Sequence, residues 1–129
     1  MQGVNFLAIM IAAVAAFVSS AAWYTLFANP MANLSNTGST EAGTSIWTML
    51  FVIAQSLVIA FMVAYFVSRL GVTGLAGAAG FGALMAIFPA AILLGSVVHE
   101  GVPLALAGIH AGDWLVKLIL IAAIVGIWR

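Results

Sequence analysis

The chain has very few charged residues and no cysteine. Only 5% of its 129 residues are charged, as three basic and three acidic side chains with a formal net charge of zero at pH 7. A water-soluble domain carries about 25% charged residues, so these six cannot cover a surface that faces water. The absence of cysteine excludes disulfides, thiolate zinc sites and a cysteine nucleophile. The neutral charge balance predicts no nucleic-acid partner.

Hydrophobic residues, in contrast, make up 66% of the chain and fall into four long runs. A helix needs about 20 apolar residues to cross about 30 Å of hydrocarbon, and each run reaches that length. The sequence therefore predicts an all-α fold, an integral membrane four-helix bundle that forms a single transmembrane domain in the lipid bilayer. The predicted spans are residues 4–27, 46–68, 73–98 and 103–128.

A polar segment separates the first two runs. Residues 29–45 are the only polar stretch of the chain and are rich in Asn, Ser, Thr and Gly, which is typical of a loop. Asn29-Pro30 ends the first span, because proline cannot continue the helical hydrogen bonds. Thr44 or Ser45 is the expected N-cap of the second helix.

Two further prolines lie in the second half of the chain. Pro89 lies near the middle of the third run and predicts a kink, because the carbonyl of Met85 loses its hydrogen-bond donor. Pro103 suits the first turn of the fourth helix.

The few charges outside the spans predict the orientation. With four spans, both termini and the turn at residues 69–73 share one side of the membrane. That side holds Arg69 and Arg129, whereas Glu41 and Glu100 lie on the other. The positive-inside rule therefore predicts cytoplasmic termini.

Small residues recur at four-residue spacing in the last two runs. Gly74, Ala78 and Gly82 follow this spacing, as do Gly108 and Gly112. Helix association in lipid relies on close backbone approach, which small side chains permit. We interpret these five as helix-packing positions. Because the fourth helix also carries a polar face, it is expected to be contacted on two sides, which favours a homo-oligomer or a membrane-protein partner.

Ionisable side chains lie inside the fourth span. His110, Asp113 and Lys117 share one face of the predicted helix. Asp113 precedes Lys117 by four residues, the favourable order for an ion pair, and a lone charge at this depth costs about 2.5–3.5 kcal/mol. Gln55 of the second run is expected at a similar depth, and these four residues form the predicted intramembrane polar cluster.

A second group is predicted to line a pocket on the non-cytoplasmic side. It consists of Ser19 and Ser20 near the end of the first span, and of His99 and Glu100 at the end of the third. Several roles stay open for these polar residues. They can form a structural ion pair that sets helix register, or a site for a small polar ligand, an ion or a proton relay.

A metal site and catalysis are the less expected alternatives. His99, Glu100, His110 and Asp113 have ligand side chains but no recognised metal-binding spacing. No nucleophile–base set, zinc-protease motif or phosphate-binding loop is present in the sequence. We therefore predict that the chain is not an enzyme and has no catalytic residue, metal or cofactor.

The two ends of the chain resemble a known family. The first span, with Asn5-Phe6 at its start and Trp23-Tyr24 near its end, is similar to that of the bacterial domain-of-unknown-function 1761 family. The segment 100–128 resembles its last span, in which a Glu-Gly-x-Pro turn leads into a helix that closes on Trp. The resemblance implies a small four-helix bacterial membrane protein and implies no activity. We expect the protein in the bacterial inner membrane.

Three functional hypotheses follow. The first is an oligomeric carrier or channel for a small polar solute, an ion or a proton, which uses the intramembrane cluster. The alternative is an accessory or structural subunit of a larger membrane complex. A membrane enzyme that acts on a lipid or a quinone is the third, and only His99, His110 and Asp113 favour it.

Overall fold

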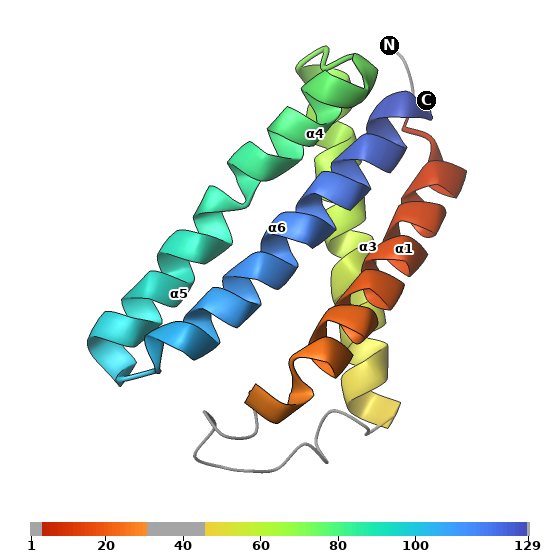
Figure 1. Ribbon diagram of the computed structural model, residues 1–129. Coiled ribbons are helices and arrows are strands. Elements are labelled where there is room, and N and C mark those ends of the chain that lie inside the picture. The colour runs from red at the N-terminus through yellow and green to blue at the C-terminus, as the bar shows by residue number, and fades with distance from the viewer. Residues whose placement is uncertain (1–3, 31–45, 129) are drawn as a thin grey trace.

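The computed structural model describes residues 4–30 and 46–128, which are mostly helical and contain no strand. Four helices, with α4 and α5 taken together as one, are long and apolar enough to cross a membrane. The protein is thus an all-α helical bundle suited to a membrane, and the predicted fold class is confirmed. Its elements are α1 (Phe6–Leu26), α3 (Ile46–Arg69), α4 (Gly74–Met85), α5 (Ile87–Glu100) and α6 (Leu104–Ile127). Figure 1 shows their arrangement.

The first and last helices meet at one end of the bundle, which we call the terminal end. Asn5 is the N-cap of α1, and its side-chain oxygen accepts hydrogen bonds from the amides of Leu7 and Ala8 at 3.1 and 3.2 Å. The Asn5 Nδ2 also donates to the carbonyl of Trp128 at 3.4 Å. The opposite end, where α5 turns into α6, is called the distal end below. The expected N-caps Thr44 and Ser45 lie outside the described residues, as does Glu41.

Glycines in the left-handed region form the two short turns. Gly71 and Gly74 have φ angles of 67° and 78° between α3 and α4, and Gly101 has 71° after α5. Glycine suits these positions because it has no Cβ to clash in that conformation. The prediction of Gly74 as a packing residue is therefore wrong, since it serves the turn and a Cβ there would meet nothing within 4 Å.

The third span is interrupted close to the predicted kink. Helix α4 ends at Met85 and α5 begins at Ile87, two residues before Pro89. Proline has no amide hydrogen to bond the Met85 carbonyl, so the helix loses a hydrogen bond where its direction changes (Figure 1). Pro103 is the N-cap of α6 and thus stands just before its first turn.

Helix α6 is the centre of the bundle. It contacts α1, α3, α4 and α5, whereas α5 contacts only α4 and α6 among the described helices. Helix α5 has no buried residue. The packed part of the bundle therefore consists of α1, α3, α4 and α6, and α5 extends along one side of α6 only (Figure 1).

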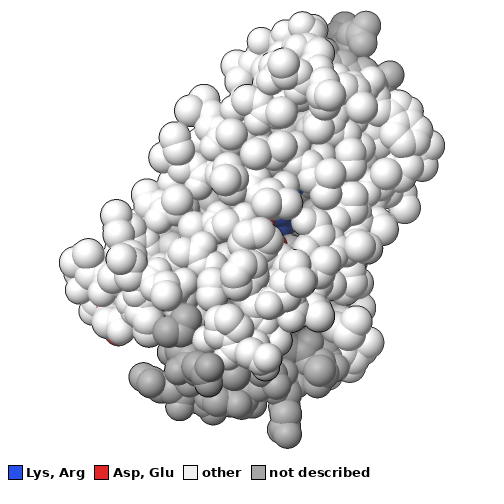
Figure 2. All heavy atoms as spheres, viewed as in Figure 1, with Lys and Arg blue, Asp and Glu red and all other residues white. Residues whose placement is uncertain are grey.

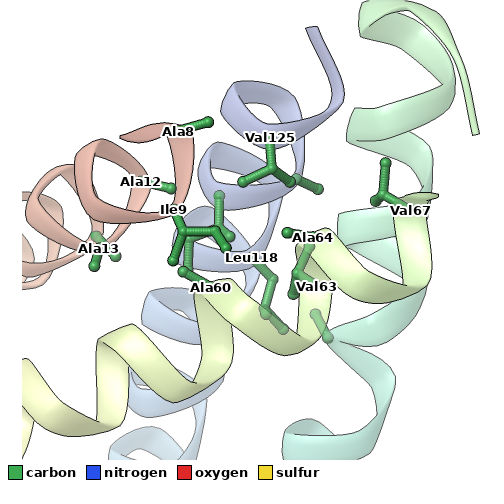
Figure 3. Packing of buried hydrophobic residues seen from close by; sticks show 14 residues of the cluster. Ala8, Ile9, Ala12, Ala13, Ala60, Val63, Ala64, Val67, Leu118 and Val125 are labelled. Carbon is green, nitrogen blue, oxygen red and sulfur yellow. The ribbon is translucent and has the colours of Figure 1, made fainter. Parts of the chain in front are cut away.

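Alanines dominate the core near the terminal end. Ala8 and Ala12 of α1 lie near Ala60 of α3, with Val125 of α6 beside them (Figure 3). Such small side chains allow the helices to approach closely, which is the main source of association in lipid. The core is thus apolar throughout this half of the bundle.

Candidate functional site

Five polar side chains of α1 and α6 form one connected group, which we call the Asp113 network. Ser20 and Tyr24 lie four residues apart on α1 and so share a face of that helix. His110, Asp113 and Lys117 come from the facing side of α6. The network lies in the distal half of the bundle, where these two helices pack together.

Asp113 is the centre of the network. Its Oδ1 accepts a hydrogen bond from the Ser20 hydroxyl at 2.7 Å, and its Oδ2 accepts one from the Tyr24 hydroxyl at 3.3 Å. The Lys117 ammonium lies 3.2 Å from the same Oδ2. Asp113 is only 2% exposed and Lys117 only 6%. A buried pair of charges is tolerated when such hydrogen bonds satisfy its remaining positions, and Asp113 meets this condition.

Tyr24 connects Asp113 to His110. The Tyr24 hydroxyl lies 2.8 Å from Nδ1 of His110 as well as within reach of Asp113. A hydroxyl has one hydrogen to donate. When Tyr24 donates to Asp113, it accepts from a protonated Nδ1, and when it donates to Nδ1, the bond to Asp113 is lost. The arrangement can therefore pass a proton between the imidazole and the carboxylate.

Lys117 has a second partner besides Asp113. Its ammonium lies 4.3 Å from the centre of the Trp114 ring, a distance at which the aromatic face attracts a cation. No buried side-chain nitrogen or oxygen lacks a hydrogen-bond partner in the described part of the chain. The lysine charge is thus stabilised by two neighbours on its own helix.

Beyond Lys117 the polar network ends. Toward the terminal end, Ile121 and Ala122 of α6 are fully buried, as are Ala12 and Ala16 of α1. Figure 2 shows one face of the molecule almost free of charged atoms, with a small patch of blue and red in a hollow near its centre. The polar groups therefore reach from the distal half to Lys117 and are closed by an apolar core on the terminal side.

Trp23 attaches α1 to α6 next to the network. Its indole nitrogen donates to the carbonyl of Ile109 at 2.9 Å. The ring lies over Gly112, where an added Cβ would be 2.5 Å from a ring carbon of Trp23. Gly112 thus has a packing role, because any side chain larger than hydrogen would displace the indole.

Substitution of Gly112 by alanine is expected to separate α1 from α6 and weaken the Asp113 network. Overpacking of this kind costs about 1–3 kcal/mol. Gly108→Ala is the matched control, because a Cβ at Gly108 meets nothing within 4 Å. Thermal unfolding in detergent should give a lower midpoint for Gly112→Ala than for Gly108→Ala. Equal midpoints would show that the indole moves aside at no cost.

The structure brings together only part of the predicted polar residues. His110, Asp113 and Lys117 join Ser20, but Gln55 is half-buried on α3 and makes none of the network's hydrogen bonds. Its predicted place in the intramembrane cluster is therefore wrong. The sequence placed Gln55 at a similar depth in the membrane, but it could not show which neighbouring helix the Gln55 side chain faces.

Within the described residues, the side chains predicted for the outer pocket do not come together. His99 and Glu100 are exposed at the end of α5, and Ser19 is half-buried on α1 beside Ser20. Helix α5 contacts α6 but not α1 within the described residues, so its end cannot complete a pocket with the α1 serines. Among the described residues no group of three or more His, Asp or Glu side chains could hold a metal ion, and the four-residue metal site considered from the sequence is not assembled.

Only some of the predicted packing residues contact another helix. Ala78 is fully buried and faces Gly126 of α6, and a Cβ on Gly82 would collide with the Leu118 carbonyl. Gly108 is exposed and contacts nothing at its Cβ position, so its assignment as a packing residue is wrong within this chain. Close approach to α6 thus uses Ala78, Gly82 and Gly112.

Sequence reasoning missed Tyr24 as a member of the network. Aromatic residues near the ends of spans are expected at the membrane interface, and Tyr24 is such a residue. Its position four residues after Ser20 was the available signal, because it puts both hydroxyls on one helix face.

Comparison with protein families gives a match. The family model described as "Protein of unknown function (DUF1761)" matches residues 7–126. No curated protein matches the chain, and no solved structure does.

Proposed function

Because the chain belongs to the DUF1761 family, whose description gives no activity, we propose a function from its own geometry: a small membrane carrier that moves protons through the Asp113 network. The observation that supports it most is the connected series His110–Tyr24–Asp113–Lys117 inside a largely apolar bundle. Ionisable side chains within a membrane are costly and commonly belong to proton or substrate pathways.

The proposed transfer begins at the half-buried His110. A proton arriving at Nε2 allows Nδ1 to give its own proton to the Tyr24 oxygen, and Tyr24 passes its hydroxyl proton to Asp113. The carboxylate becomes neutral and the net positive charge moves from the aqueous side to the Asp113–Lys117 pair. Lys117 then lacks a counter-charge, which is unfavourable in a buried site. A shift of α6 against α1 would relieve this unfavourable interaction. Protonation of Asp113 would then change the side of the membrane from which the Asp113 network is accessible, and the carrier would move a proton alone or together with a small polar solute.

We further propose that the termini are cytoplasmic and that the protein lies in a bacterial inner membrane. Arg69 at the end of α3 and the exposed Glu100 at the end of α5 support this orientation. In it, the Asp113 network is nearer to the outside and the apolar core near Ala12 and Ile121 closes the cytoplasmic half. The carrier works without a catalytic residue, in keeping with the expectation that the chain is not an enzyme.

Proton flux into liposomes tests the proposal. Wild-type protein should dissipate a pH gradient faster than empty liposomes, as reported by an enclosed pH-sensitive dye. Tyr24→Phe keeps the ring but removes the hydroxyl that joins His110 to Asp113, and it should abolish most of the flux, as should Asp113→Asn. Ser19→Ala is the matched control, because Ser19 makes none of the network's hydrogen bonds, and its flux should equal that of the wild type.

Two results would count against proton transfer. Wild-type flux equal to that of empty liposomes would remove its basis. Flux that is unchanged in Tyr24→Phe, in a variant that is folded, would show that the tyrosine does not connect His110 to Asp113. In either case the hydrogen bonds from Ser20 and Tyr24 to Asp113 would retain the structural role of setting the register of α1 and α6.

A second candidate is an accessory or structural subunit of a larger membrane complex. It is favoured by the span Gly74–Glu100, of which only 11% is buried inside the chain. Such a span leaves most of its surface to lipid or to another protein. Purification from native membranes in mild detergent separates the possibilities: a stoichiometric partner protein supports the subunit, and a homo-oligomer that contains only this chain excludes it.

A further inference from the structure

An apolar cleft opens on the side of the bundle where α5 and α3 are not in contact. Its volume is about 210 Å³. Helix α3 provides one wall, the junction of α4 and α5 provides the other, and α6 provides the floor. The residues that line it are all apolar: Val58, Ile59, Met62, Val63, Phe66, Met85, Phe88, Pro89, Trp114 and Leu118.

The cleft results from the interrupted third span. Helix α4 packs against α6 through Gly82, but the helix breaks after Met85 and α5 shares no contact with α3 in the described residues. The two rims are strongly exposed, with Val58 at 63% and Phe88 at 65%. The interior of the cleft is therefore continuous with the apolar surface that the spans present to lipid.

We propose that this cleft binds a segment of the hydrocarbon chain of a membrane lipid. A bound water needs two to four polar partners, and the lining residues offer only apolar side chains. An apolar cavity of roughly 150 Å³ takes up a molecule as small as benzene, so this cleft has room for part of one acyl chain. A second helix, about 10 Å wide, is too large for it.

A hydrocarbon chain bound in the cleft would also affect the nearby Asp113–Lys117 pair. Trp114 lines the cleft, and the Lys117 ammonium lies 4.3 Å from the centre of its ring. The indole therefore separates the lipid-facing cleft from the Asp113–Lys117 pair. A hydrocarbon chain in the cleft keeps water away from Trp114 and so from the lysine side of the pair. This binding is independent of proton transfer through Tyr24.

Fluorescence quenching by brominated lipids tests the proposal. Of the four tryptophans, Trp23 lies in the last turn of α1, Trp47 is the second residue of α3 and Trp128 follows α6. Only Trp114 lies at mid-span, so bromine at the middle of phosphatidylcholine acyl chains should quench mainly its emission. The difference in emission between wild type and Trp114→Phe in the same vesicles gives the emission of Trp114 alone. We expect the brominated lipid to remove most of this emission.

A cleft-filling variant makes the test specific. Ile59→Phe places a larger side chain in the cleft and should remove most of the mid-chain quenching of Trp114. Ile53→Phe is the same change on the same helix at a residue that does not line the cleft, and it should leave the quenching as in the wild type. If Ile59→Phe does not fold, as judged by circular dichroism, Val58→Phe at the rim replaces it.

Two outcomes would overturn the proposal. Trp114 emission that is insensitive to mid-chain bromine would mean that α5 or a second copy of the protein covers the cleft. Equal quenching in the cleft-filling variant and Ile53→Phe would mean that lipid meets Trp114 without entering the cleft.

Discussion

Replacement of Lys117 by methionine is expected to destabilise the bundle by about 3–5 kcal/mol, because it leaves a carboxylate buried without its counter-charge. Asp113 is 2% exposed, and the hydrogen bonds from Ser20 and Tyr24 do not neutralise its charge. Asp113→Asn should also destabilise, since Lys117 then keeps only the Trp114 ring as its partner.

The double variant distinguishes a pair from two independent residues. Asp113→Asn combined with Lys117→Met removes both charges, and such replacements are often close to neutral. We therefore expect the double variant to be more stable than Lys117→Met alone in reversible unfolding with a denaturing detergent. Additive losses in the double variant would contradict an ion pair between the two side chains.

Gly82→Ala is expected to produce the second large effect, a loss of about 1–3 kcal/mol from overpacking. A Cβ at this position would collide with the backbone of α6, at the Leu118 carbonyl and within 2.8 Å of the Ile119 Cα. Backbone atoms cannot rotate away as a flexible side chain can, so α4 and α6 would have to separate.

Gly80→Ala is the control for this change. Gly80 lies in the same helix, and a Cβ there meets nothing within 4 Å. Alanine in a helix interior is favoured over glycine by up to about 1 kcal/mol. The midpoint of thermal unfolding should thus fall for Gly82→Ala and stay or rise for Gly80→Ala. A fall of equal size in both would show that helix propensity or flexibility, and not contact with α6, determines the result.

The fold was predictable from the sequence because lipid imposes a simple length and composition on each span. Four runs of apolar residues and the break at Pro103 sufficed to place the helices. The expected end at Asn29-Pro30 was wrong in detail, because α1 ends at Leu26 and Asn29 and Pro30 are themselves helical. The same reasoning located the interruption near Pro89. It could not show that α5 loses contact with α3 beyond Met85, because that depends on the direction the helix takes after the break.

The part of the site that lies on a single helix was predictable from the sequence. His110, Asp113 and Lys117 share a face of α6, and helical periodicity is enough to find such a group. Tyr24 and Trp23 depend on the register between α1 and α6, for which a single sequence gives no direct signal. The outer pocket was predicted because its residues share one end of their spans. Among the described residues α5 contacts α6 but not α1, so the end of α5 and the α1 serines are not brought together.

Infrared spectroscopy of the Asp113 carboxyl group tests the central claim most directly, namely that a charged aspartate–lysine pair is buried between α1 and α6. The wild-type protein in lipid at neutral pH should show no protonated-carboxyl band that Asp113→Asn removes, because the Lys117 ammonium lies 3.2 Å from Oδ2 of Asp113 and attracts the charged carboxylate. Such a band should appear in Lys117→Met and disappear when Asp113→Asn is added. A protonated-carboxyl band already present in the wild type and absent from Asp113→Asn would show a neutral Asp113, and the account of a buried ion pair would be wrong.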